Sequence, residues 1–140
     1  MKTRSDARYA YLDSSAIVKL LTREAETSAL ESALAHLDGL LSSAVSTVEI
    51  ARAAGRMQNR KLLQRVEDVQ ESLVTVEMTA GIVSLAGTLA PPELRSLDAI
   101  HLATALSLDL GDEGELAFIT YDNRLAAAAT KAGLLVHSPR

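Results

Sequence analysis

The chain has 140 residues, no cysteine and a formal net charge of −4, and it is 48 % hydrophobic but only 3 % aromatic. This length suits one domain, and the lack of cysteine excludes disulfides and thiolate metal sites. No apolar run reaches the roughly 18 residues of a membrane helix. The charged start, residues 1–8, lacks the apolar stretch of a signal peptide. We therefore expect a cytoplasmic protein with no membrane segment: one domain over residues 1–140, with 1–8 as an N-terminal lead.

Short β-prone segments alternate with helical ones along the whole chain. Apolar residues at helical spacing, turn signals and helix-ending glycines mark their limits. We predict strands at residues 9–12, 40–45, 73–78, 116–120 and 134–137, helices at 16–21, 26–37, 46–58, 59–72, 79–89, 96–110 and 123–131, and a loop at 111–114. Alternation of this kind predicts an α/β fold, a three-layer α/β/α sandwich with a central parallel sheet of four to five strands.

Four acidic residues are placed where such a fold would gather them. Asp13, Glu49, Asp98 and Asp122 each follow a strand-like segment or lie near the start of a helical one. Parallel sheets bind ligands at the carboxyl ends of their strands. Carboxylates gathered there repel one another and need a cation, and hard oxygen ligands suit Mg²⁺ or Mn²⁺. The pattern predicts a metal-dependent enzyme that cleaves phosphodiester bonds.

Each acid also has a simpler explanation. Asp13 and Asp122 are placed to cap helices, and Ser46 with Glu49 fits a capping box. Asp98, in the first turn of its helix, complements the helix dipole. Capping needs no acid in particular, since serine, threonine and asparagine serve as well. Four acids at such positions together therefore favour the metal site.

Basic residues are concentrated in one stretch, residues 50–65, which contains five of them and no acid. Arg52, Arg56 and Arg60 recur every four positions and would line one helical face. That face is either solvated or contacts substrate phosphates near the acids, and Arg52 could also pair with Glu49. His101 is interpreted as a helix-surface or packing residue and not as a ligand.

Four motifs in order resemble those of PIN-domain proteins, and most closely the VapC-type toxins of bacterial toxin–antitoxin pairs. They are YLDSSAIVK (11–19), STVEIAR (46–52), LRSLDAIHLA (94–103) and FITYD (118–122). The resemblance covers nearly the whole chain beyond residue 8. It implies an endoribonuclease that needs Mg²⁺ or Mn²⁺, a small α/β/α sandwich, and a small cognate antitoxin that blocks the pocket. Homodimers or hetero-oligomers with the antitoxin are also implied.

The family's four acids match Asp13, Glu49, Asp98 and Asp122, and its hydroxyl before the fourth acid matches Thr120. We expect Asp13, Asp98 and Asp122 to hold the metal and Glu49 to bind through water or orient the attacking water. Ser14, Ser15 and Thr120 would hydrogen-bond the carboxylates, and Arg52, Arg56 and Arg60 would contact a single-stranded RNA.

Two other readings remain. A catalytically silent binding module could keep the PIN fold, although the complete acid set argues against it. A metal-dependent phosphohydrolase of another class would use Asp13 as a nucleophile. In one such class a second aspartate stands two positions later, where this chain has Ser15, and another needs adjacent acids before the first strand, where Asp6 stands alone.

Overall fold

The structure is a computed structural model that describes residues 6–108, 110 and 115–140. The predicted loop at 111–114 and most of the N-terminal lead lie outside these residues. In chain order the elements are β1 (Ala7–Leu12), α1 (Ser14–Leu21), α2 (Thr27–Leu34), β2 (Gly39–Ser43), α3 (Ala44–Met57), α4 (Arg60–Ser72), β3 (Val74–Val76), α5 (Ala80–Thr88), α6 (Ser96–Ser107), β4 (Glu115–Ile119), α7 (Asn123–Lys131) and β5 (Leu135–His137). In the described part of the chain, no helix is both long and apolar enough to cross a membrane.

The five strands form one sheet in the order β3-β2-β1-β4-β5, and every neighbouring pair is parallel. This confirms the predicted α/β sandwich around a parallel sheet. The central strand β1 lies between β2 and β4, so the segments that leave these three strands start side by side. Parallel strands end at the same edge, which therefore collects residues from distant parts of the sequence.

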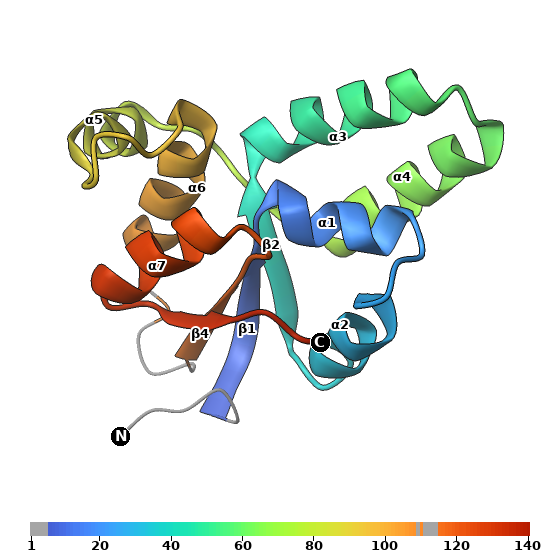
Figure 1. Ribbon diagram of the computed structural model, residues 1–140, viewed down its shortest axis with the longest axis horizontal. Helices are drawn as coiled ribbons and strands as arrows, with labels where there is room; N and C mark the ends of the chain where they lie inside the picture. Colours follow the sequence, from blue (N-terminus) through green and yellow to red (C-terminus); the bar gives the residue numbers. More distant parts are fainter. Residues whose placement is uncertain (1–5, 109, 111–114) are drawn as a thin grey trace.

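Helices cover both faces of the sheet, as Figure 1 shows. Successive strand residues point to opposite faces. Ala10 and Leu12 of β1 join the core formed with α1, α2, α3 and α4. Tyr11 points the other way and packs with α6 and α7, where its ring stacks on Phe118 at 5.4 Å. The fully buried Tyr11 thereby anchors the face of the sheet that carries α6.

The junction between β2 and α3 differs from the prediction. The strand ends at Ser43, and the helix begins at Ala44, two residues before the predicted start. Ser43 is the cap, because its hydroxyl accepts from the backbone N–H of Val45 at 3.1 Å. The Ser46 hydroxyl donates to the Ser43 carbonyl instead. The predicted capping box is therefore wrong, and Glu49 lies in the second turn with its carboxylate available to other partners.

The predicted stripe of arginines is interrupted. Helix α3 ends at Met57, and Gln58 adopts the left-handed conformation with φ 48°. Asn59 then caps α4 by accepting from the N–H of Lys61 at 3.0 Å. Arg60 belongs to this second helix, so the prediction that it shares one helical face with Arg52 and Arg56 is wrong.

Candidate active site

Asp13 directly follows β1 and is buried, with 1 % of its surface exposed. Its Oδ1 accepts hydrogen bonds from the backbone N–H of Ala16 at 3.0 Å and from the Ser15 hydroxyl at 2.7 Å. Its Oδ2 accepts from the Thr120 hydroxyl at 2.6 Å. Burial raises the pKa of Asp13, and the bonds from Thr120, Ser15 and Ala16 offset this only in part. A nearby cation would favour its ionised form.

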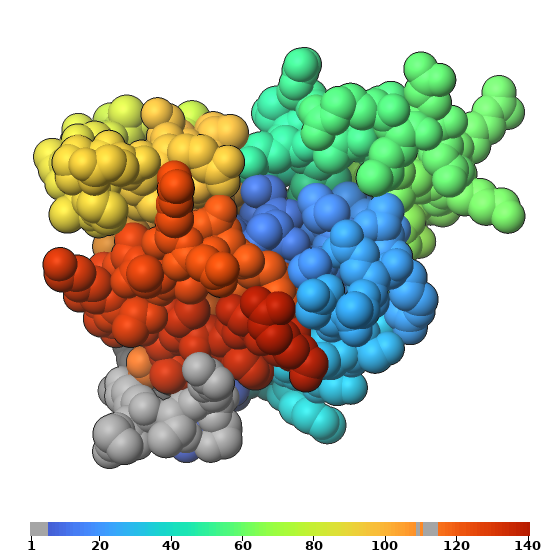
Figure 2. Space-filling model, viewed as in Figure 1, coloured from blue at the N-terminus to red at the C-terminus, as the bar shows by residue number. Residues whose placement is uncertain are grey.

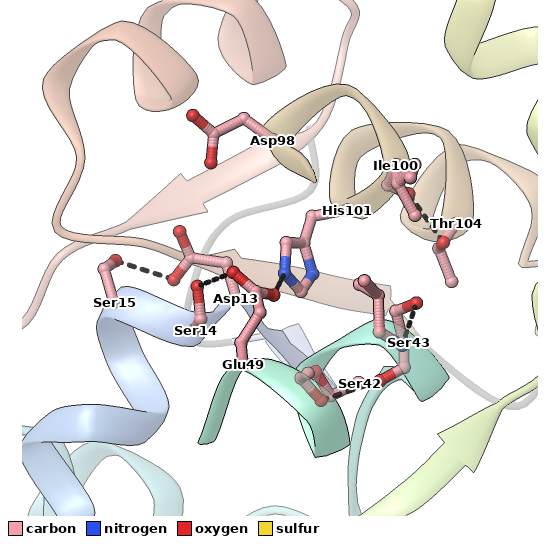
Figure 3. Close-up of polar contacts among 12 residues, drawn as sticks. Asp13, Ser14, Ser15, Ser42, Ser43, Glu49, Asp98, Ile100, His101 and Thr104 are labelled. Carbon is pink, nitrogen blue, oxygen red and sulfur yellow. Dashed lines mark hydrogen bonds and ion pairs between the residues drawn. The ribbon is translucent and has the colours of Figure 1, made fainter. Parts of the chain in front are cut away.

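Glu49 reaches back from α3 toward the start of α1. The Ser14 hydroxyl donates to its Oε2 at 3.0 Å, and His101 contacts its Oε1 at 2.8 Å (Figure 3). Burial alone would raise the pKa of Glu49. The hydrogen bonds and charge of His101, Ser14 and Arg95 outweigh burial, so the pKa lies below its ordinary value. The carboxylate is thus held ionised in a fixed orientation.

His101 links this carboxylate to the core. An ionised carboxylate only accepts hydrogen bonds, so Nε2 of His101 must carry a proton and donate to Glu49. Nδ1 lies 2.7 Å from the Tyr11 hydroxyl, and the imidazole is completely buried. The sequence interpretation of His101 as a surface or packing residue missed this chain of contacts. The available signal was its place between apolar residues, Ile100 and Leu102, because a polar side chain that is buried among such residues needs partners.

Asp98 and Asp122 share one arginine. Nε of Arg95 donates to Oδ2 of Asp98 at 3.0 Å, and Nη2 donates to Oδ2 of Asp122 at 3.0 Å. Oδ1 of Asp122 caps α7 by accepting from the N–H of Leu125 at 2.9 Å. The cap on Asp122 and the metal role are therefore compatible, since each would use a different oxygen. Sequence reasoning did not select Arg95, although it lies inside the third motif.

The four acids thus lie at one edge of the sheet, where Arg95 links Asp98 with Asp122 and where Asp13 and Glu49 each have their own donors. In the described part of the chain, no three Asp, Glu or His side chains are grouped closely enough to hold a metal ion. The donor chemistry still suits Mg²⁺ or Mn²⁺, because all four groups offer carboxylate oxygens. Moreover, two of those oxygens already converge on a single cation, the Arg95 guanidinium.

A groove of about 640 Å³ lies between α1 and α3, and of the four acids only Glu49 is among the residues that line it. Figure 2 shows this hollow between the green α3 and the orange-yellow α6, with the blue start of α1 beneath. Ser14, Ser15 and Glu49 lie at one part of its wall, and Arg52 and Arg56 at another, whereas Arg60 is not among the residues that line it. Among the described ion pairs there is none between Glu49 and Arg52.

Residues 10–131 match the family described as the PIN domain. The chain belongs to the PIN-domain family. Its relatives include ribonuclease VapC46 of Mycobacterium tuberculosis, 42 % identical over 137 residues that cover 92 % of this chain and 96 % of the relative. Ribonuclease VapC47 of the same species is 36 % identical, with the same coverage of both chains. The predicted resemblance to VapC-type PIN domains is confirmed.

Solved structures confirm the PIN fold. VapBC2 from Rickettsia felis, bound to a DNA fragment from its promoter, aligns with a TM-score of 0.72 at 10 % identity and covers 94 % of this chain and 99 % of that chain. VapBC-1 from nontypeable Haemophilus influenzae aligns with a TM-score of 0.70 at 19 % identity and covers 93 % of this chain and 97 % of that chain. At these identities the likeness concerns the fold alone.

Proposed function

We propose that this chain is a divalent-metal-dependent endoribonuclease and the toxin of a toxin–antitoxin pair. The observation that carries the proposal is the placement of Asp13, Glu49, Asp98 and Asp122 at one edge of the sheet, with Glu49 in the wall of a groove that Arg52 and Arg56 also line. The ribonuclease names of the VapC relatives support the reaction class. The match over residues 10–131 supports treating the chain as one PIN domain.

In this proposal Asp13, Asp98 and Asp122 hold Mg²⁺ or Mn²⁺. When bound, such an ion lowers the pKa of a water molecule and offsets the negative charge that grows on the phosphoryl oxygens. Thr120 and Ser15 keep the oxygens of Asp13 in place through their hydroxyl donors. Asp122 is fixed by its capping bond to Leu125, which leaves its other oxygen directed toward Arg95.

Glu49 orients the attacking water and takes its proton. Its lowered pKa keeps it ionised at neutral pH, and the donors on Ser14 and His101 fix both of its oxygens. The proton goes from water to the carboxylate, the new bond forms between the water oxygen and phosphorus, and the bond to the leaving ribose oxygen breaks, with that oxygen taking a proton from solvent water. His101 takes part only by positioning Glu49, because it is completely buried.

The substrate in this proposal is single-stranded or looped RNA. Exposed phosphates of such a strand can reach a groove that a regular duplex would not enter, and Arg52 and Arg56 offer charged donors along its wall. The chain has few aromatic side chains for base stacking, so phosphate contacts and shape carry the recognition. Arg60 is excluded from this set by its place on α4.

We further propose a small antitoxin as the protein partner, alone or with paired toxins. Two of the similar solved structures are titled VapBC, which supports such a partner. On this chain, Val48 and Met57 of α3 and Leu63 of α4 are apolar side chains that are each more than half exposed. An antitoxin segment that covered them would remove this apolar surface from water.

The test incubates the purified protein and Mn²⁺ with a mixed RNA pool and sequences the cleaved ends. Asp98→Asn should remove cleavage, because it deletes one ligand charge at the proposed site. Asp68→Asn is the matched control, since Asp68 is an exposed acid on α4 whose side chain accepts a hydrogen bond from Gln64. Metal binding without cleavage of any RNA would favour the silent binding module.

A further inference from the structure

Arg95 directly precedes α6 and contacts two of the four acids of the site. It is the residue immediately before Ser96, the first residue of that helix, and its side chain is 73 % exposed. Its two partners come from different segments: Asp98 lies in the first turn of α6, and Asp122 precedes α7. One guanidinium therefore joins two of the three carboxylates proposed to bind the metal.

The charges around Arg95 indicate what the contact does. Asp98, Asp122 and Glu49 all raise the pKa of Arg95, with Asp98 the largest cause. Carboxylates this close would repel one another without a cation between them. Arg95 supplies that cation, and it occupies the Oδ2 atoms of Asp98 and Asp122 that a metal ion would otherwise bind.

The contact is also of a kind that can be replaced. The Arg95 side chain is 73 % exposed, although the side chains of Asp98 and Asp122 are only 13 % and 24 % exposed. Water competes for the guanidinium, and a long side chain must be held in place, which limits what each pair contributes. Asp13, by contrast, is fixed by three donors in the interior. A dication would bind the same oxygens with more charge, and the arginine side chain has solvent into which it can move.

We infer that Arg95 is an internal counter-cation that competes with the divalent metal for Asp98 and Asp122 and must leave them when the metal binds. This inference rests on the proposed metal-dependent function. By linkage, whatever Arg95 contributes to the stability of the metal-free protein is subtracted from metal affinity. Arg95 thus offsets the repulsion between Asp98 and Asp122 when no metal is bound. It also raises the metal concentration that is needed to load the enzyme.

The experiment measures Mn²⁺ binding by calorimetry for the wild-type protein, Arg95→Gln and Arg95→Lys. We expect Arg95→Gln to bind Mn²⁺ roughly tenfold more tightly, as befits the loss of two partly exposed ion pairs. Arg95→Lys keeps the charge but has no fork to reach both carboxylates, so its affinity should fall between the other two. Arg23→Gln is the matched control, because Arg23 is an exposed arginine paired with Glu31 on a distant surface.

Thermal unfolding gives a second measurement. Metal-free Arg95→Gln should melt a few degrees lower than the wild type, and saturating Mn²⁺ should close that gap. Unchanged or weaker Mn²⁺ binding in Arg95→Gln would overturn the inference. RNA cleavage by the wild type distinguishes failure of this inference from failure of the proposed ribonuclease function. If the wild type cleaves RNA and Arg95→Gln binds Mn²⁺ with unchanged affinity, the inference about Arg95 fails and the proposed ribonuclease function stands. If Arg95→Gln binds Mn²⁺ more tightly but the wild type cleaves no RNA, the inference about Arg95 stands and the proposed ribonuclease function fails.

Discussion

The two halves of the acid site are built differently. On the β1 side, Asp13 and Glu49 are held by buried or half-buried donors, among them Thr120 and the completely buried His101. On the α6–α7 side, Asp98 and Asp122 are held by the exposed side chain of Arg95. The donors to Asp13 and Glu49 cannot move away without disrupting the core. The Arg95 side chain can move away from Asp98 and Asp122 into solvent.

One half of the site therefore sets the positions of the carboxylates, and the other half controls whether a metal ion is bound. Fixed donors around Asp13 and Glu49 set the geometry before any ligand arrives, which lowers the reorganisation needed for the reaction. A replaceable cation on Asp98 and Asp122 keeps those acids together while the metal is absent. Variants on the first side should therefore change the rate of cleavage, and variants on the second should change the concentration of metal required.

The largest effect is expected for Asp13→Asn. Loss of this charge should reduce cleavage by at least about 10³-fold, since a ligand and its negative charge are both removed. The metal-free protein should be as stable as the wild type or more stable by about 1 kcal/mol, because burial raises the pKa of Asp13 and favours a neutral group. Cleavage rates and urea unfolding of the same preparation measure both.

The control for this prediction is Thr120→Val, which removes a donor to Asp13 while the carboxylate remains. Thr120 also accepts from the N–H of Asp122, so this variant should lose stability as well as activity. A large loss of stability in Asp13→Asn would show that the buried carboxylate serves the fold, and the division into two halves would fail on its first side.

A smaller effect is expected when the link between Glu49 and the core is cut. His101→Leu leaves the Tyr11 hydroxyl and one oxygen of Glu49 without their buried partner. Stability should fall by about 2–3 kcal/mol. The catalytic rate at saturating RNA should fall by about 10- to 100-fold while the KM for RNA stays close to that of the wild type. Single-turnover kinetics separate the two quantities.

Tyr11→Phe tests the far end of the same chain. It removes the hydroxyl beside Nδ1 but leaves the bond between His101 and Glu49. We expect a loss of about 1 kcal/mol in stability and a change in cleavage of only a few fold. Equal losses of activity in Tyr11→Phe and His101→Leu would mean that packing around the ring, and not the orientation of Glu49, governs the rate.

The pH dependence of stability should show the contribution of Glu49. Its pKa is lowered in the folded protein, so its ionised form stabilises the fold above the ordinary carboxyl pKa of 4.5, and this contribution is lost as the pH falls through the lowered value. Glu49→Gln should therefore flatten the acid side of the curve of unfolding free energy against pH. Denaturant titrations from neutral pH downward, without metal, measure it. If the stability curve of Glu49→Gln stays parallel to that of the wild type, His101 and Ser14 do not stabilise the charge of Glu49.

The sequence predicted what is encoded locally. Asp13 and Asp122 stand beside short apolar strands and ahead of helices, so their positions follow from neighbours within a few residues. The parallel sheet follows from the same alternation of strands and helices. The start of α3 was misplaced because Ser43 and Ser46 are equally good caps by sequence, and the strand pairing of β2 decides between them.

Arg95 and His101, whose partners are distant in the sequence, were not predicted, whereas Ser14 and Thr120, which bond Glu49 and Asp13 over 35 and 107 residues, were expected to hydrogen-bond the carboxylates. Arg95 binds Asp122 across 27 residues, and His101 binds Glu49 across 52. Contacts over such separations produce no periodic pattern in the sequence. An arginine or a helical histidine taken alone is also common on protein surfaces. Each half of the site thus contains one contact, that of His101 or that of Arg95, that only the folded arrangement reveals.

The smallest effect is expected along the groove, outside both halves. Arg56→Gln should weaken RNA binding by a few fold and reduce the slope of log affinity against log salt by about 0.7, the value for one phosphate contact on a single strand. Arg60→Gln is the matched control, because Arg60 is a basic residue of the same stretch that does not line the groove. Fluorescence titrations of a labelled, uncleavable RNA at several salt concentrations provide the slopes. If both variants behave like the wild type, the arginines on α3 form a solvated face. If Arg60→Gln shows the larger change, the strand follows α4 and leaves the groove between α1 and α3 empty.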